Sequence, residues 1–125
     1  MKSKCYCGSA DSFEECCEPY IKEFKTAESA VILMRSRYSA YATQHADYLV
    51  STTHNSTRRH HSKKAILEWS QSNQWIKLEV LKTTATTVEF KAYYLDRQLQ
   101  MQIHHEHSTF RFENEKWFYV DGDFY

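Results

Sequence analysis

The sequence predicts an α+β fold, because helical periodicity fills its first half and strand periodicity fills its second. Apolar side chains recur at steps of three and four residues between residues 29 and 72, as in amphipathic helices. From Trp75 onward, apolar and polar side chains alternate, as in strands. Helices followed by an antiparallel meander indicate α+β rather than βαβ units. A third observation is that every cysteine lies within residues 1–17, which predicts a small unit in front of this body.

This amino-terminal unit contains the most specific pattern in the chain. Its cysteines form a C-x-C pair, a short loop that includes Gly8, and then an adjacent pair. Structural zinc sites favour four thiolate or imidazole ligands in a closed tetrahedron. The C-x-C pair can place two thiolates on one turn, and a glycine lets the backbone fold tightly over a metal. We therefore predict one structural Zn²⁺ per chain, with the ligands Cys5, Cys7, Cys16 and Cys17.

Two disulfides are the main alternative, because an even number of cysteines in a short secreted chain normally forms bridges. However, residues 1–30 show no basic start followed by an apolar run, so no signal peptide is visible, and the segment is too charged to span a membrane. We therefore expect a cytoplasmic protein without a membrane span, in which reducing conditions favour metal binding. Redox catalysis is disfavoured because the C-x-x-C spacing is absent.

Three helices are predicted after a charged link at residues 18–25. Thr26 is the expected N-cap of the first, with Glu28 near its positive end, and Ser62 is the expected N-cap of the third. A loop should separate the second helix from the third. The predicted helices span residues 29–43, 44–54 and 62–72.

Four strands should follow, and turn signals separate them. Asp96-Arg97 marks one turn, and the polar run at residues 113–115 marks another. The third strand is long and either continues or bends near Ser108. The predicted strands span residues 75–81, 86–95, 98–112 and 116–121.

Most of the sequence resembles a known family, most clearly up to His54 and in the last strand. The string CYCGSADSFEECCEPY resembles the SEC-C zinc motif, named for the carboxyl end of the SecA motor. Downstream, LMRSRYSAYATQHADYLVSTTH and WFYVDG resemble the small bacterial YchJ-like family. That resemblance implies a knuckle at residues 1–22 and a nuclear transport factor 2-like cone at residues 23–125. In such a cone, about three helices pack inside a curved antiparallel sheet.

Cones of this kind often leave an apolar pocket, and several residues could line it. A carboxylate beside a tyrosine would make a workable acid–base pair. A buried arginine–glutamate pair that only holds helix to sheet would explain Arg35 or Arg37 with Glu106 equally well. The candidate pocket residues are Arg35, Arg37, Tyr38, Tyr41, Tyr48, His54, Trp69, Glu106, Ser108, Tyr119 and Asp121.

Strand alternation places Glu106 and Ser108 on one face of the third strand and His105 and His107 on the other. An H-x-H pair on one face can bind metal. We expect these two histidines to be exposed strand residues instead, because no third ligand follows at a fixed spacing.

The composition limits the possible partners. Sixteen basic and sixteen acidic residues cancel, so no nucleic acid or anionic membrane is expected as a partner. The sequence is therefore interpreted as a zinc-binding accessory or adaptor protein, whose cysteine knuckle contacts a partner protein, as the SEC-C resemblance implies for export or quality control. The alternative is a cone pocket that binds a small apolar molecule or converts it by isomerase or lyase chemistry. A binding protein is favoured over an enzyme.

Overall fold

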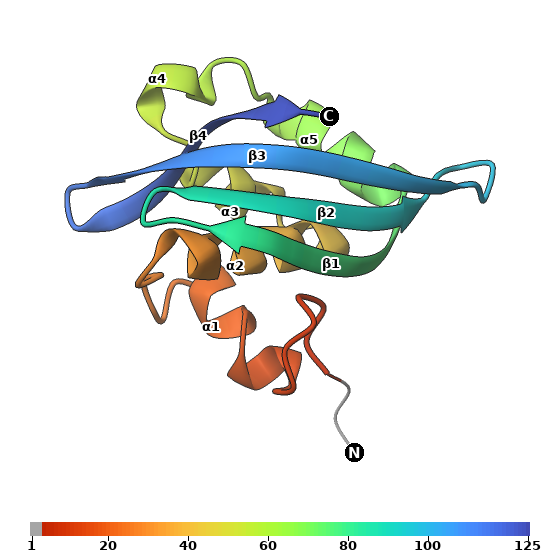
Figure 1. Ribbon diagram of the computed structural model, residues 1–125, viewed down its shortest axis with the longest axis horizontal. Coiled ribbons are helices and arrows are strands. Elements are labelled where there is room, and N and C mark those ends of the chain that lie inside the picture. The colour runs from red at the N-terminus through yellow and green to blue at the C-terminus, as the bar shows by residue number, and fades with distance from the viewer. Residues whose placement is uncertain (1–3) are drawn as a thin grey trace.

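A curved sheet covered on one face by helices forms the body of the protein. The computed structural model describes residues 4–125. Its sheet has four strands in the order β1-β2-β3-β4, and the helices lie behind it in Figure 1. The amino-terminal segment lies beyond the β1 edge of the sheet. The α+β class is confirmed. The elements are η1 (Phe13–Glu15), α1 (Glu18–Ile21), α2 (Ala30–Thr43), α3 (Ala46–Ser51), α4 (Asn55–Arg58), α5 (Lys63–Ser72), β1 (Gln74–Thr83), β2 (Thr87–Leu95), β3 (Met101–Glu113) and β4 (Lys116–Phe124).

The central helix α2 begins at a serine cap. Ser29 Oγ accepts a hydrogen bond from the backbone N–H of Ile32 at 3.2 Å, so the N-cap is Ser29 and not Thr26. The helix ends where Gln44 adopts the left-handed conformation, with φ of 64°. Ser62 caps α5 as predicted, because its Oγ accepts from the N–H of Ala65 at 3.0 Å.

Two one-turn helices were not predicted. In place of the charged link, α1 places Pro19 in its first turn, where proline is tolerated because that N–H has no helical partner. The expected loop after α3 contains α4, whose N-terminus is capped by the His54 ring. Both helices are too short to show a helical period in the sequence.

The antiparallel meander is confirmed, and its register fixes which side chains face the helices. Glu106 pairs with Phe90 of β2, while Ser108 lies opposite Gly122 of β4. Glu106 and Ser108 are buried on the inner face, as the alternation predicted. Strands β1 and β4 extend beyond their predicted bounds, whereas β2 begins at Thr87 and β3 at Met101, later than predicted.

The segment after α3 closes the outer edge of β4. Thr53 and Tyr119 form a parallel bridge, and the N–H of His54 donates to the carbonyl of Tyr119 at 2.7 Å. Sheet and helices thereby enclose one apolar core, in which Leu33, Leu49 and Val88 are almost fully buried. Within residues 4–125, each helix is too short or too polar to cross a bilayer.

Candidate metal site and cone cavity

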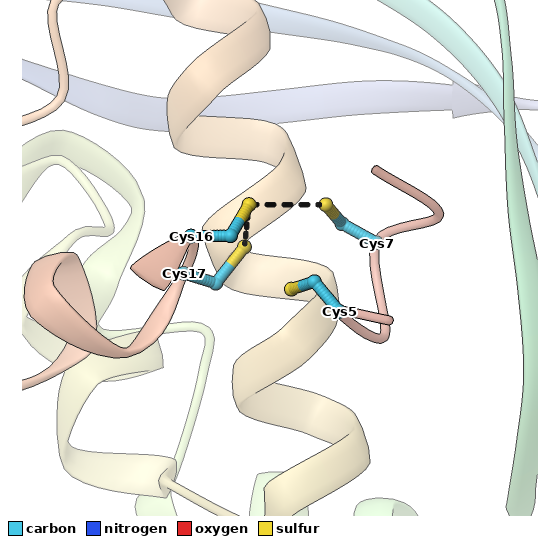
Figure 2. Close-up of side chains that lie close together, drawn as sticks. All are labelled: Cys5, Cys7, Cys16 and Cys17. Atoms are coloured by element: carbon cyan, nitrogen blue, oxygen red, sulfur yellow. Dashed lines mark hydrogen bonds between the residues drawn. The ribbon is translucent and has the colours of Figure 1, made fainter. Parts of the chain in front are cut away.

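Four sulfur atoms meet beside α2. The Sγ atoms of Cys5, Cys7, Cys16 and Cys17 all lie within 4.8 Å of one another, and all four cysteines are free. Figure 2 shows Cys5 and Cys7 reaching the cluster from one side and the adjacent pair from the other. Cys5, Cys7 and Cys17 are buried, while Cys16 is half-buried. Among residues 4–125, this cluster is the one group of three or more histidine, cysteine or acidic side chains close enough to share a metal ion.

A tight turn brings the C-x-C pair into place. The N–H of Gly8 donates to the carbonyl of Cys5 at 3.0 Å, and Gly8 adopts φ of 93°, which is unfavourable for other residues. The N–H of Cys5 donates to the carbonyl of Asp11 at 2.8 Å and folds the loop back. Cys16 is the C-cap of η1, and Cys17 is the N-cap of α1. The junction of these two short helices therefore presents both adjacent thiols to the loop.

The spacing of these sulfur atoms fits a tetrahedral metal. Zinc–sulfur bonds of about 2.3 Å imply a sulfur–sulfur separation of about 3.8 Å along each edge of a tetrahedron. The Sγ atoms of Cys7 and Cys16 are 3.7 Å apart, and those of Cys16 and Cys17 are 3.9 Å apart. Four thiols at these distances can hold one metal ion.

Side chains of α2 connect this cluster to the body of the protein. Arg35 Nη1 donates to the carbonyl of Cys7 at 2.9 Å, so Arg35 supports the cysteine loop. Ser39 Oγ lies 3.6 Å from Cys5 Sγ, and Ser9 Oγ donates to Cys16 Sγ at 3.2 Å. The buried cysteines belong to the same apolar core as α2.

The thiols perturb one another strongly. Hydrogen bonds from Cys17 and Cys5 lower the pKa of Cys7. The pKa of Cys17 is raised, mainly by its hydrogen bonds with Cys5 and Cys7. Burial raises the pKa of Cys16 to about 11. Four adjacent thiolates would therefore repel one another, and a divalent metal ion held among them would supply the compensating charge.

A second site, the cone cavity, lies between the helices and the inner face of the sheet. Its volume is about 150 Å³. It contains several of the predicted residues, namely Arg37, Tyr38, Tyr41, Trp69, Glu106, Ser108 and Tyr119. The other predicted residues have different positions. Arg35 contacts the cysteine loop, Tyr48 bonds Ser36, His54 pairs with Glu113, and Asp121 is exposed.

Three hydrogen bonds hold Glu106 in the cavity. Its Oε2 accepts from Ser108 Oγ at 2.6 Å and from Tyr119 Oη at 2.7 Å, and its Oε1 lies 2.7 Å from His104 Nε2. Burial alone would raise the pKa of Glu106, but these three hydrogen bonds outweigh it and hold the pKa below its ordinary value. The carboxylate is therefore ionised at neutral pH.

Gly122 creates the room for this carboxylate. A Cβ on Gly122 would lie 2.1 Å from Glu106 Oε2 and 2.6 Å from its Cδ, far inside van der Waals contact. Gly122 is therefore required by the packing of Glu106 rather than by a turn.

Arg37 does not pair with Glu106 as the sequence allowed. Its Nη1 donates to the carbonyl of Leu49 at 2.9 Å and to Thr52 Oγ1 at 2.6 Å. Its guanidinium lies over the Tyr119 ring, 4.6 Å from the centroid. Arg37 thus joins α2 to the end of α3, and its guanidinium contacts the sheet by stacking on the ring of Tyr119 in β4.

Several cavity residues were missed by sequence reasoning. The strand alternation already placed His104 on the same face as Glu106, and that signal could have identified it. The positions of His61, Trp75 and Phe124 depend on how α5 and the sheet ends meet, which the sequence does not show. On the opposite face, His105 pairs with Glu89 at 2.8 Å.

Acid should destabilise the protein partly through Glu106. A carboxyl group whose pKa is lower in the folded than in the unfolded state stabilises the fold above its ordinary pKa of 4.5, and this contribution is lost as pH falls through the folded value. Thermal midpoints measured between about pH 6 and pH 3 should fall less steeply in Glu106→Gln than in the original protein. Any effect of acid on the cysteine cluster is common to both proteins, so the difference between the two curves reports Glu106. Parallel curves would contradict the assignment.

Comparison with known proteins gives consistent matches. A family model described as "YchJ, middle NTF2-like domain" matches residues 29–122. A UPF0225 protein of Geobacter sulfurreducens is 40% identical over 98% of this chain and 80% of its own length. Another, from Photorhabdus laumondii, is 39% identical over 98% of this chain and 81% of its own.

Solved structures show the same architecture. The solution structure of a SEC-C motif containing protein from Rhodopseudomonas palustris superposes with a TM-score of 0.88 at 34% identity, covering 98% of each chain. The crystal structure of a SEC-C motif containing protein from Psychrobacter arcticus gives a TM-score of 0.77 at 30% identity, covering 97% of this chain and 81% of that one. The NTF2-like cone with a cysteine cluster in front of it is therefore confirmed.

Proposed function

This chain belongs to the YchJ-like family, and from that premise we propose that it is a zinc-stabilised accessory protein whose amino-terminal knuckle contacts a partner protein. The observation that supports the metal is the mutual proximity of four cysteine sulfur atoms, all within 4.8 Å. Zinc is the metal that best suits four thiolates in a closed tetrahedron, and such a site has a structural role.

The role of this zinc is to fix the shape of the knuckle. We assign residues 1–22 to the knuckle and residues 23–125 to the cone. Within residues 4–22, the knuckle contains the short helices η1 and α1, the turn at Gly8 and an isolated bridge between Lys4 and Ser12. A reducing compartment such as the cytoplasm would keep its cysteines available as ligands.

An exposed aromatic side chain supports the contact with a partner. Tyr6 lies between the ligands Cys5 and Cys7, is 48% exposed, and packs edge-on against Phe13 with ring centroids 5.3 Å apart. Phe24, just after α1, is 81% exposed. Aromatic side chains held rigidly at a surface are enriched at protein interfaces. The metal would therefore order a surface that includes Tyr6.

Metal analysis of protein purified under reducing conditions tests this proposal. The original chain should contain one zinc ion, and Cys16→Ser should contain less than one while most of the α+β body stays folded. Tyr6→Ala is the matched control, because it changes the same turn and keeps all four ligands. It should retain its zinc but lose the partner protein. Unchanged zinc in Cys16→Ser would refute the ligand assignment.

A further inference from the structure

The cone cavity offers a binding site that is distinct from the cysteine cluster. One wall is aromatic: the rings of Trp69 and Trp75 have centroids 4.9 Å apart, and Tyr41 lies 5.5 Å from Trp69 and 5.6 Å from Trp75. Trp69 is 37% exposed and Phe124 is 66% exposed, so the cavity reaches the surface between α5 and the end of β4. Its volume of about 150 Å³ matches a cavity that holds one benzene-sized molecule.

Arg37 also lines the cavity, and within residues 4–125 some of its donor groups have no hydrogen-bond partner. Arg37 is only 6% exposed. Within residues 4–125, Nη1 is the donor in all of its hydrogen bonds. Among the described residues, the one fully enclosed side-chain N or O atom that lacks a partner is Ser12 Oγ. The Nε and Nη2 groups of Arg37 are therefore not fully enclosed by protein, and the cavity that Arg37 lines is the space available to them.

The hydroxyl of Tyr41 is a second free donor. None of the hydrogen bonds in the described part of the chain uses it, and Tyr41 lines the same cavity. Tyr41 and Arg37 are four residues apart on α2, so their side chains project from the same face of that helix. A ligand oxygen in this position could accept hydrogen bonds from both side chains.

The charges in the cavity favour an uncharged ligand. The positive charge of Arg37 is balanced by the ionised Glu106, whose oxygens already accept from His104, Ser108 and Tyr119. Burial and the charge of Arg37 lower the pKa of His61, which keeps that ring neutral. An anionic ligand would be repelled by Glu106 and a cationic ligand by Arg37, and little water is present to screen either repulsion.

We propose that the cone cavity binds one uncharged, single-ring aromatic molecule whose carbonyl oxygen accepts hydrogen bonds from Arg37 and Tyr41. The ring lies against Trp69 and Trp75, and the carbonyl points toward α2. Glu106 holds no ligand atom in this arrangement; it balances the charge of Arg37.

Calorimetric titration of the full zinc-loaded chain with three ring-sized probes tests the ligand class. The probes are acetophenone, benzoate and benzyltrimethylammonium, which share a ring and differ in the charge of the attached group. Acetophenone should bind at least about tenfold more tightly than either ion, because burying an uncompensated charge is costly. Failure of acetophenone to bind, or tighter binding of either ion, would overturn the proposal.

A pair of matched variants tests the location. Tyr41→Phe removes only the hydroxyl and should weaken acetophenone about fivefold, as expected for the loss of one hydrogen bond. Tyr48→Phe is the same change outside the cavity, where the hydroxyl bonds Ser36 at 2.6 Å, and it should leave the affinity unchanged. Tyr41 is preferred to Arg37 for this test because Arg37 also holds the end of α3. Equal affinities of the two variants would place the probe elsewhere and contradict the assignment.

Discussion

Chelation of the zinc is expected to lower the thermal midpoint of the protein sharply. Binding of structural zinc to four-ligand peptides releases about 10 kcal/mol or more, and where the site forms only on folding this binding energy stabilises the fold. Cys5, Cys7 and Cys17 are buried in the same core as α2, so loss of the metal loosens more than the chain end. We expect the free energy of unfolding to fall by several kcal/mol, measured with and without chelator in a thiol reductant.

Hydrogen exchange identifies the region that loosens. Amides of the knuckle and of α2 near Arg35 and Ser39 should lose protection, whereas those of β3 should change little, because only the former contact the cluster. Ser12→Ala is a suitable control, since Ser12 Oγ is buried without a partner and its removal breaks no hydrogen bond. This variant should keep its zinc and its midpoint. Identical unfolding of the zinc-loaded and chelated proteins would refute a structural role for the metal.

Gly122→Ala is expected to destabilise the cone by about 3 kcal/mol, from overpacking together with lost hydrogen bonds to a charged group. The new methyl group would collide with Glu106, which is buried and cannot move without giving up its bonds to Ser108 and Tyr119. Thermal or urea unfolding measures the loss directly. The knuckle lies outside this region, so zinc content should not change.

A double-mutant cycle shows whether Glu106 is the cause. Glu106→Ala removes the side chain that blocks the methyl group, so Gly122→Ala should cost much less in that background. The coupling between the two positions should then be about 1 kcal/mol or more. Additive effects would mean that the destabilisation by Gly122→Ala comes from the backbone at position 122 and not from a clash with the Glu106 carboxylate.

The parts of the protein that could be predicted are those whose residues lie close together in the sequence or recur at a fixed period. The cysteine cluster was predictable because all four ligands lie within two short segments, and the thiols themselves report the chemistry. The meander was predictable because strand alternation is strict around Glu106, and the same alternation placed Ser108 beside it. In both cases the residues that act together are close in the chain or separated by a fixed period.

The cavity could be predicted only in part, because its partners come from distant segments. Arg37 lies on α2, but its bonds reach the end of α3, and neither the acceptors nor the stacking on Tyr119 follow from spacing. Arg35, two residues earlier on α2, instead supports the cysteine loop. The role of Gly122 was invisible because it depends on the side chain across the strand pair.

The most direct test of the central claim is X-ray absorption at the zinc edge of the purified, reduced protein. Coordination by the four cysteines predicts a first shell of four sulfur atoms at about 2.3 Å and no nitrogen or oxygen ligand. Cys16→Ser should replace one of these sulfur atoms or lose the metal. A shell dominated by nitrogen or oxygen, or a protein that carries no zinc and has its cysteines bridged, would contradict the account.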